Sequence, residues 1–384
     1  MRFLHTADWH LGRTLRGRSR VDELERALGQ VVDMAKSEDV DAVLVAGDIY
    51  DQRVLSAEAD RLVFETLLAL YSSGIKVVAV PGNHDSAPRL GAIAPVLDHI
   101  GTSVVSRVRR PQTGGLVEVP AKDGSHTALV ACIPFVSPRR FSDAASEFTD
   151  IATGYNEYDD GMGSLFAAFE KHFRSDAVNI VLAHIFVSGA KPAGSERQIT
   201  LGADYAVSPM RLPAKATYVA LGHIHRPQKV PGAPCEARYS GSLIQLDFGE
   251  RGQDKGVVLI EAAPGKPPKA KTLPIAAGRQ LLDIEATVDE LDAVAAKVSD
   301  AYLRVNLKAD TPMPGLADRV RKALPNALDV RLVLPEQEGD DVKVTLKGLD
   351  PREQFVAYYK AEHSAEPADE LLVAFDRVHE EVAV

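Results

Sequence analysis

Cysteine is scarce in this chain: Cys132 and Cys235 are the only two among 384 residues, and neither has a neighbour typical of a metal site. Two such residues are expected to be buried apolar positions and not a disulfide, which suits a reducing compartment. No run of about 18 apolar residues occurs, so no transmembrane helix is expected. The first residues run straight into a strand pattern without the apolar core of a secretory signal, so we expect a cytoplasmic protein.

Basic residues are not in excess: Lys and Arg number 44 against 54 Asp and Glu, and the formal net charge is −10. This balance argues against a generally basic protein that coats nucleic acid. It does not exclude a polyanionic substrate, because bound divalent cations and local arginines can reverse the sign of the charge at a site. The chain is also too long for one ordinary core, so several domains are expected.

Short β-rich runs alternate with helical spacing in the first part of the chain. Runs at 2–7, 41–47 and 76–82 each end at a polar or glycine-containing loop, and apolar residues recur at helical spacing between them. This alternation predicts parallel pairing with right-handed crossovers, and in such sheets ligands gather at the carboxyl ends of the strands. Further strand-like runs lie at 127–133, 178–184, 216–222, 236–242 and 255–262.

The last third of the chain is organised differently. Residues 263–271, rich in proline and lysine, predict a linker, and a smaller β-α-β-α-β pattern follows. After an acidic stretch come two short amphipathic helices, near 351–361 and 367–383. We therefore expect a large N-terminal domain, a small α/β domain and a C-terminal helical segment, with bounds 1–275, 276–338 and 339–384.

Five polar segments each follow a β-like run, so each lies where a strand ends. They are HTADWHLG (5–12), AGDIYD (46–51), PGNHD (81–85), LAHIFVSG (182–189) and LGHIHRP (221–227). Between them they hold Asp8, His10, Asp48, Asn83, His84, His184, His223 and His225. Any one segment has an ordinary structural explanation, but all five in this order predict a metal centre.

The residue types fit that chemistry. Mixed imidazole and carboxylate ligands suit Mn²⁺, Fe²⁺ or Zn²⁺, whereas Mg²⁺ prefers nearly all-oxygen shells. Asp8 and His10 are two positions apart, so on an extended chain both side chains point to one side, and His223 and His225 have the same spacing. Asp48 is suited to bridge two cations because a carboxylate has two oxygens.

The order D-x-H, G-D, G-N-H-D, an isolated H and G-H-x-H resembles the calcineurin-like metallophosphoesterases. MRFLHTADWHLGRTL at the start and YSGSLIQLDFGE at 239–250 are similar, more closely, to the SbcD family, the nuclease subunits of bacterial SbcCD complexes. The likeness is dense over about the first 250 residues. It implies an α/β fold: a metallophosphoesterase β-sandwich flanked by helices, with a small α/β capping domain and a C-terminal helical segment that binds a partner.

The resemblance also implies two metal ions, expected to be Mn²⁺. The first would be held by Asp8, His10, Asp48 and His225, and the second by Asp48, Asn83, His184 and His223. His84 would act on the phosphate and the leaving group instead of binding metal. Asp51 matches a position that orients this catalytic histidine in many superfamily members.

The implied activity is hydrolysis of DNA at double-strand ends and hairpins by an exonuclease and endonuclease that functions in repair. The implied partner is SbcC, an ATPase of the structural-maintenance-of-chromosomes type, with a homodimer inside a heterotetramer associated with the nucleoid. Two other hypotheses use the same fold: a small-molecule (cyclic nucleotide) phosphodiesterase or phosphatase, and a non-catalytic adaptor. The capping domain and apolar tail weigh against the first, and the intact ligand set weighs against the second.

Two surface features have open interpretations. Arg13, Arg16, Arg18 and Arg20 follow the first polar segment and either contact the DNA backbone or form a solvated loop. The predicted last helix has an apolar face that must be buried somewhere, either on its own chain or on SbcC. We favour the partner because the tail follows the acidic stretch. The residues assigned to that contact are Phe355, Tyr358, Leu371, Leu372, Phe375 and Val378.

Overall fold

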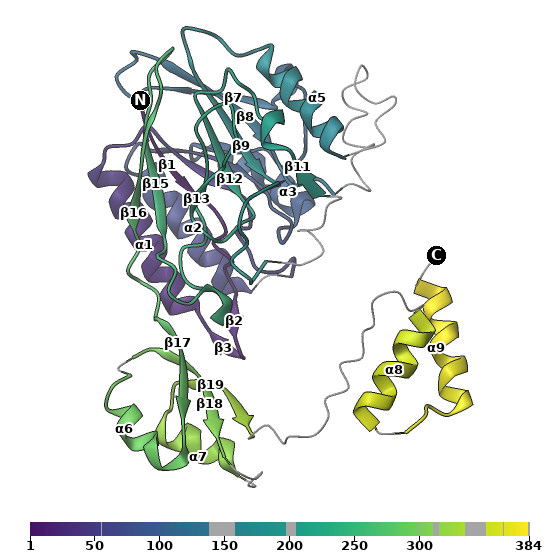
Figure 1. Cartoon of the computed structure of the whole chain (residues 1–384). Helices are drawn as coiled ribbons and strands as arrows, with labels where there is room; N and C mark the ends of the chain where they lie inside the picture. The colour runs from purple at the N-terminus through teal and green to yellow at the C-terminus, as the bar shows by residue number, and fades with distance from the viewer. Residues whose placement is uncertain are drawn as a thin grey trace. The chain divides into compact units, whose positions relative to one another are not determined.

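The computed structural model describes residues 1–54, 56–137, 158–196, 205–298, 300–309, 315–334, 351–363 and 365–382 (Figure 1). It divides into two compact units, Met1–Val333 and Leu334–Val384, which are described separately below. None of the described helices is long and apolar enough to cross a membrane.

The first sheet is built from the N-terminal half and completed by two later strands. Its order is β16-β15-β1-β4-β5-β6. The four strands of the N-terminal half pair in parallel, as the alternation predicted, and β15 and β16 extend the sheet in antiparallel fashion. The strands are β1 (Arg2–Thr6), β4 (Ala42–Ala46), β5 (Lys76–Val80), β6 (Thr102–Val104), β15 (Gly256–Glu261) and β16 (Lys269–Pro274). The helices between them are α1 (Val21–Ser37), α2 (Ala57–Tyr71) and α3 (Ala87–Asp98).

The second sheet has the order β13-β14-β12-β9-β8-β7. Its strands are β7 (Leu116–Pro120), β8 (Thr127–Ile133), β9 (Val178–His184), β12 (Tyr218–Gly222), β13 (Gln228–Lys229) and β14 (Ala237–Tyr239). α5 (Tyr158–Glu170) packs on its outer face. Shorter elements are β2 (Thr14–Leu15), β3 (Arg18–Ser19), β10 (Phe186–Val187), β11 (Ala206–Val207) and the 3-10 helices η1 (Pro111–Thr113), η4 (Pro209–Arg211), η5 (Phe248–Glu250) and η6 (Val288–Glu290).

The two sheets pack face to face because their strands are apolar on both sides. In β1, Phe3 points into the core between the sheets, while Leu4 joins the core under α1 and α2. Ile180 and Val181 of β9 divide in the same way between the inner core and the layer under α5. Side chains alternate along a strand, so each sheet packs on the other sheet with one face and on helices with the opposite face. The result is a four-layer sandwich in which the two sheets are the inner layers and helices are the outer layers (Figure 1).

The predicted linker at 263–271 is wrong at its C-terminal end. β16 begins at Lys269 and pairs with β15 along its whole length. Most of its side chains are exposed, and it lies at the edge of the sheet. Lysines on an edge strand face water and discourage pairing with another chain, so a strand of this kind looks like a solvated linker in the sequence.

A small three-stranded parallel sheet follows, with the predicted β-α-β-α-β order. It consists of β17 (Leu281–Ala286), α6 (Leu291–Ala295), β18 (Tyr302–Lys308), α7 (Leu316–Ala323) and β19 (Ala327–Val333). It has an apolar core of its own but belongs to the same compact unit as the sandwich. The predicted boundary at 338 lies outside the described residues, and the division into three domains stays a prediction.

The second unit is a pair of helices, α8 (Pro351–His363) and α9 (Asp369–Val382). The rings of Phe355 and Phe375 stack between them with centroids 4.4 Å apart and planes 12° from parallel. Arg352 pairs with Asp376 at 3.4 Å. Part of the apolar face is therefore used within the chain.

Candidate metal centre

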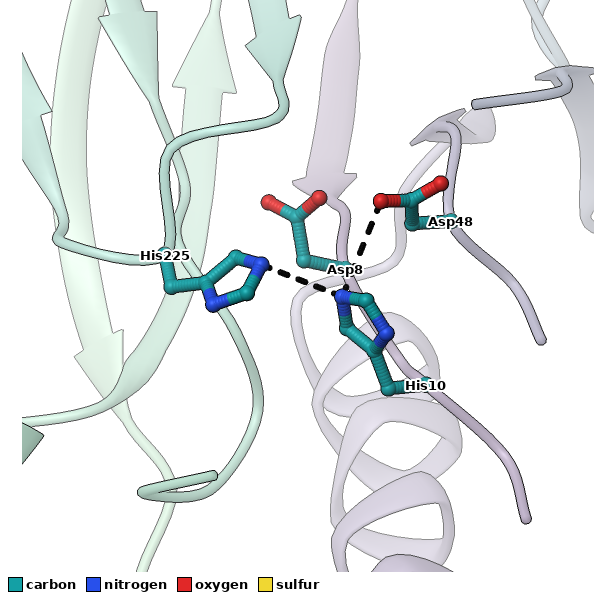
Figure 2. A group of neighbouring side chains, drawn as sticks. All are labelled: Asp8, His10, Asp48 and His225. Carbon is teal, nitrogen blue, oxygen red and sulfur yellow. Dashed lines mark hydrogen bonds and ion pairs between the residues drawn. The ribbon is translucent and has the colours of Figure 1, made fainter. Parts of the chain in front are cut away.

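The polar residues grouped by the sequence converge on one edge of the sandwich. Asp8 follows β1 and Asp48 follows β4, while His184 ends β9 of the other sheet and His225 follows β12. In Figure 2, His225 approaches from the second sheet and meets His10 of the first, beside the carboxylates of Asp8 and Asp48. The carboxyl ends of parallel strands share one edge, and two sheets packed face to face bring two such edges together. The side chains are buried: Asp8 and His184 are fully inaccessible, and Asp48 is 1% exposed.

The first donor set contains Asp8, His10, Asp48 and His225. One ligand atom from each lies within 4.8 Å of the others. His10 Nε2 is 3.1 Å from His225 Nε2 and 3.7 Å from Asp48 Oδ2. Two imidazole nitrogens that face each other beside two buried carboxylates could hold a metal ion, and this mixed set suits Mn²⁺, Fe²⁺ or Zn²⁺.

The second donor set contains Asp48, Asn83, His184 and His223. Asn83 Oδ1 lies 3.0 Å from His184 Nε2 and 2.9 Å from His223 Nδ1. Asp48 Oδ2 lies 3.5 Å from His184 Nε2, so one carboxylate oxygen faces a histidine of each set. That position is the one required of a bridging ligand. His184 donates from Nδ1 to the carbonyl of Ala46 over 2.7 Å, which directs Nε2 to the site.

The backbone at the site is strained. φ is +51° at Asp8, +49° at His10, +50° at Asp48 and +105° at His223. Each such residue costs about 1–3 kcal/mol. The strain is held by hydrogen bonds between the segments: Asp8 N to Gly47 O at 2.9 Å and His10 N to Asp48 O at 3.0 Å. The expectation that Asp8 and His10 lie on an extended chain is therefore wrong, although both reach the site.

Two glycines allow the segments around Asp48 to approach one another closely. A Cβ on Gly47 would lie 2.4 Å from His184 Nδ1, and Gly47 has a φ of +86°. A Cβ on Gly82 would lie 2.2 Å from Asp48 Oδ1. The turns after β4 and β5 can therefore close around Asp48 only without side chains at these two positions.

Electrostatics at the site follow from burial and from the neighbouring charges. Burial raises the pKa of Asp8, with a further contribution from Asp48. Burial also tends to raise the pKa of Asp48, but the neighbouring imidazoles outweigh it. His184, His10 and His84 hold the Asp48 pKa well below its usual value. Burial opposes protonation of His184, yet Asp48 raises its pKa to about 9. Binding of a divalent ion by these side chains therefore competes with their protonation.

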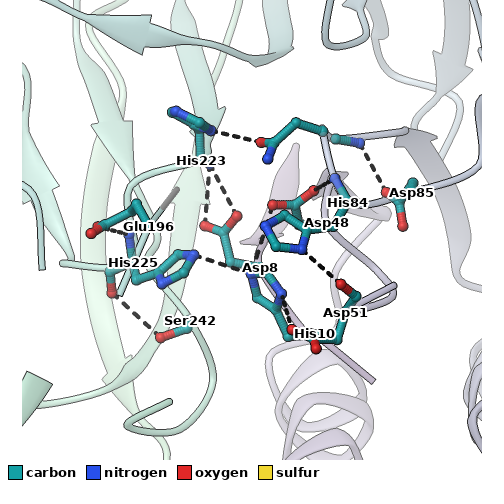
Figure 3. A network of polar contacts seen from close by, with 12 residues as sticks. Asp8, His10, Asp48, Asp51, His84, Asp85, Glu196, His223, His225 and Ser242 are labelled. Carbon is teal, nitrogen blue, oxygen red and sulfur yellow. Dashed lines mark hydrogen bonds and ion pairs between the residues drawn. The ribbon is translucent and has the colours of Figure 1, made fainter. Parts of the chain in front are cut away.

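His84 lies beside both donor sets. Its backbone N–H donates to Asp48 Oδ1 over 2.8 Å, and its ring Nδ1 donates to the backbone carbonyl of Asp51 over 2.7 Å. The Asp51 carboxylate lies instead against His10 Nδ1 at 3.2 Å and Arg13 Nη1 at 3.1 Å. Asp51 therefore reaches the predicted catalytic histidine through its main chain, and its side chain orients a predicted ligand (Figure 3).

A buried polar group behind His225 was not among the predicted site residues. Glu250 Oε1 is 3.2 Å from His225 Nδ1, and Lys255 Nζ is 2.5 Å from Glu250 Oε2 and 2.8 Å from the carbonyl of His225. Burial opposes ionisation of Glu250, but Lys255 and His225 lower its pKa. Ser195 Oγ approaches His225 Nδ1 at 2.6 Å. Glu250 ends the segment YSGSLIQLDFGE, whereas nothing in the sequence indicated Lys255.

Asp85 supports the opposite side of the site. Its carboxylate accepts hydrogen bonds from the backbone N–H groups of Gly82, Ile49 and Tyr50 at 2.8, 3.2 and 2.9 Å. Burial and the nearby charge of Asp48 raise its pKa to about 6. It joins the turns after β4 and β5, and its only signal in the sequence is its place in PGNHD.

The four arginines of the first loop have different environments. Arg20 is fully buried and donates to Glu23 and to the carbonyl of Gln245, so it has no access to a phosphate and its DNA-binding assignment is wrong. Arg13 is engaged with Asp51. Arg16 and Arg18 are exposed, although Arg16 lies 3.6 Å from Asp329 of the small sheet.

The residues assigned to partner binding are only partly exposed. Phe355 and Phe375 stack on each other. Tyr358 is 56% exposed and Leu371 is 39% exposed, while Leu372 is half-buried. The side chain of Val378 lies outside the described residues.

Comparison with known families and proteins shows which family the chain resembles. The family model for calcineurin-like phosphoesterases matches residues 1–227, and the model for the type 5 capsule protein repressor C-terminal domain matches residues 278–363. The chain is 33% identical to the SbcD subunit of the nuclease SbcCD of Bacillus subtilis, over 97% of this chain and 96% of that protein. The protein of the same name from Rhodobacter capsulatus is 33% identical over 86% of each chain. The one from Escherichia coli K12 is 28% identical over 87% of this chain and 84% of its own.

Proposed function

Because the chain belongs to the SbcD family of nucleases, which is built on the calcineurin-like phosphoesterase domain, we propose that it hydrolyses DNA phosphodiester bonds with two divalent metal ions. The observation that carries the proposal is the position of Asp48 between two donor sets, with one oxygen 3.7 Å from His10 Nε2 and 3.5 Å from His184 Nε2. A carboxylate with only a structural role need not lie equally near the histidines of two donor sets. A carboxylate that bridges two metal ions in a phosphodiesterase must lie between both sets.

The donor sets define how the ions would be held. Asp8, His10, Asp48 and His225 would bind one, and Asp48, Asn83, His184 and His223 the other. The nitrogen-rich chemistry of these sets favours Mn²⁺ over Mg²⁺. When bound, such a pair supplies a nucleophilic hydroxide at neutral pH and neutralises charge on the phosphate. Glu250 and Asp51, behind His225 and His10, hold these imidazoles in orientation.

His84 is the proposed catalytic residue of the chain. The Asp51 carbonyl holds a proton on Nδ1, so the ring has a defined orientation, with its centroid 4.7 Å from that of His10. A histidine in this place can donate a hydrogen bond to the phosphate and a proton to the departing sugar oxygen. His84 is 8% exposed, so only a small part of it is open to a substrate.

The wider assembly follows the family. Double-strand ends and hairpins are the proposed substrates, and the exposed Arg16 and Arg18 are the proposed contacts with their phosphate backbone. The small sheet of β17–β19 is the proposed cap over the DNA. The exposed surface of α8 and α9 around Tyr358 and Leu371 is the proposed contact with SbcC, in a heterotetramer that contains a homodimer of this chain.

Cleavage of linear and hairpin duplex DNA with added Mn²⁺ tests the proposal, with a cyclic nucleotide as parallel substrate. Wild type, His84→Ala, metal-stripped protein and the control His126→Ala are compared, each with and without SbcC. His126 is exposed and precedes β8, at the opposite end of that strand from the end that lies beside His184. We expect Mn²⁺-dependent DNA cleavage by wild type and His126→Ala, and a loss of about 100-fold or more in His84→Ala with two Mn²⁺ still bound.

Other outcomes select the competing hypotheses. Turnover of the cyclic nucleotide with DNA untouched beside SbcC would indicate a small-molecule phosphodiesterase. Two bound metal ions with neither substrate cleaved would indicate an adaptor.

A further inference from the structure

A loop of residues 193–196, in the connection after β10, lies directly against the proposed ligand His225. Ser195 Oγ is 2.6 Å from His225 Nδ1. The carboxylate of Glu196 accepts the backbone N–H of His225 over 3.0 Å, and Figure 3 shows this contact beside the first donor set. The loop therefore contacts both the ring and the main chain of one proposed ligand.

Glu196 determines the shape of this loop through its own carboxylate. Besides the N–H of His225, Oε1 accepts that of Ala193 over 2.8 Å, and Oε2 accepts those of Gly194 and Ser195 over 2.8 and 3.2 Å. Four backbone N–H groups thus converge on a side chain that is 6% exposed. Hydrogen bonds to a carboxylate are among the strong ones, so Glu196 fixes the place of Ser195 relative to His225.

The hydroxyl of Ser195 lies between His225 and Glu250. His225 Nε2 faces His10 in the first donor set, so a neutral His225 that binds metal through Nε2 has its proton on Nδ1. That N–H is directed at Ser195 Oγ, and the Ser195 hydroxyl donates in turn to Glu250 Oε1. Glu250 itself is farther from Nδ1, at 3.2 Å. Ser195 therefore supplies the nearest acceptor for the proton that fixes the orientation of the ring.

Two glycines allow the loop to pack closely on η5, which carries Glu250. A Cβ on Gly194 would lie 3.7 Å from Gly249 Cα, and one on Gly249 would lie 3.2 Å from the carbonyl oxygen of Ala193. Gly194 also has a left-handed backbone, with φ +96°. This close packing brings the Ser195 hydroxyl to the carboxylate of Glu250.

We propose that Ser195 and Glu196 are positioning residues for His225, and that the loop 193–196 thereby sets the affinity of the first donor set for its metal ion. The inference rests on the proposed function, in which His225 is a ligand of that ion. His225 belongs to the first donor set alone, so the effect is confined to one of the two ions. Loss of an outer partner of a ligating histidine typically lowers metal affinity by about 10–100-fold.

Calorimetric titration of the full-length, metal-free protein with Mn²⁺ tests the proposal. Ser195→Ala removes one hydroxyl, and Glu196→Gln replaces one of the two acceptor oxygens by an amide donor. His225→Ala identifies which binding step belongs to the first donor set. Ser195→Thr keeps the hydroxyl, and Ser188→Ala is the matched control, a half-buried serine of the same connection whose backbone N–H donates to Val207.

We expect the first-set step to weaken about ten-fold in Ser195→Ala and about ten-fold or more in Glu196→Gln, with the other step unchanged. Ser195→Thr and Ser188→Ala should keep the wild-type affinity at both steps. The melting temperature of the metal-free protein should not change in Ser195→Ala, because the four hydrogen bonds of Glu196 remain.

An unchanged first-set affinity in Ser195→Ala overturns the inference. An equal loss at both steps also overturns it, because that is the effect of a loop with only a structural role. Ser195→Ala leaves the loop backbone intact, so it decides the question even if Glu196→Gln does not fold. Two Mn²⁺ bound by a wild type that does not cleave DNA would contradict the proposed function instead.

Discussion

Asp48 joins the two halves of the site through one side chain. Its Oδ2 faces His10 and His184, and its Oδ1 accepts the backbone N–H of His84 over 2.8 Å. Its backbone is left-handed, with φ +50°, and its carbonyl receives the N–H of His10. Both carboxylate oxygens and the backbone carbonyl of Asp48 thus make contacts in the site. A substitution at this position therefore removes contacts that hold the two donor sets together.

His184 gives the metal-free protein a pH dependence. Its pKa is raised to about 9 from 6.5, because Asp48 stabilises the imidazolium despite burial. A raised pKa contributes stability that is fully present below pH 6.5 and is lost as pH rises through about 9. We expect the melting temperature of EDTA-treated wild type to fall more between pH 6.5 and pH 9 than that of His184→Asn.

Differential scanning calorimetry of the two proteins, with His126→Asn as control, measures that difference. Equal slopes in wild type and His184→Asn would contradict the assigned ion pair. With Mn²⁺ present the trend should reverse, since the cation replaces the proton and its affinity rises with pH.

The turn after β5 depends on a glycine, because there is no room for a Cβ at position 82. Gly82 lies against Asp48, and Asp85 three residues later fixes the same turn through three backbone N–H groups. The turn carries Asn83 and His84 between these two anchors. Its shape therefore determines one predicted ligand and the proposed catalytic histidine together.

Gly82→Ala should disrupt the site. The added Cβ would lie 2.2 Å from Asp48 Oδ1 and 2.5 Å from Asp48 N, and one of those neighbours is backbone. We expect a loss of at least one bound Mn²⁺ and a fall in cleavage of about 100-fold, because displacements of about 1 Å have effects of this size. Manganese content and cleavage rate are the measurements.

The matched control is Gly29→Ala within α1, where nothing lies within 4 Å of the new Cβ. That change should stabilise the protein by about 0.5–1 kcal/mol in urea unfolding and leave cleavage intact. Full activity in Gly82→Ala would show that the turn can move without cost.

At the level of the whole unit 1–333, the sandwich and the small sheet share an interface centred on Tyr302. The guanidinium groups of Arg20 and Arg279 lie 5.3 and 5.0 Å from its ring centroid, and Tyr302 is 4% exposed. It packs with Leu15 and Phe248 in a common apolar cluster. Arg20, for which the sequence left open contact with DNA or a place in a solvated loop, lies in this interface instead.

Tyr302→Ala should lower the free energy of unfolding by about 3–5 kcal/mol, the range for buried aromatic truncations. The exposed Tyr71, at 49%, provides the control Tyr71→Ala, with an expected change within about 0.5 kcal/mol. Urea unfolding measures both. A small effect in Tyr302→Ala would mean that the two sheets are held together by other contacts.

The sequence by itself determined the ligand types and the strand ends that carry them. Asp8, Asp48 and His184 could be singled out because metal chemistry restricts residue types, and a β-like run before each segment places it at one edge of the sheet. Parallel pairing in the first half also followed from local patterns. These are properties of short segments, and short segments are what a sequence displays.

Tertiary structure alone decided which charged groups are buried and which segments meet. Glu250 and Lys255 lie behind His225, and Arg20 is inaccessible, although no local pattern separates them from surface charges. The left-handed backbone at His10 and the contact of the loop 193–196 with His225 depend on residues distant along the chain. The reason is physical: burial, strain and shape are set by long-range packing, which residue order encodes only jointly.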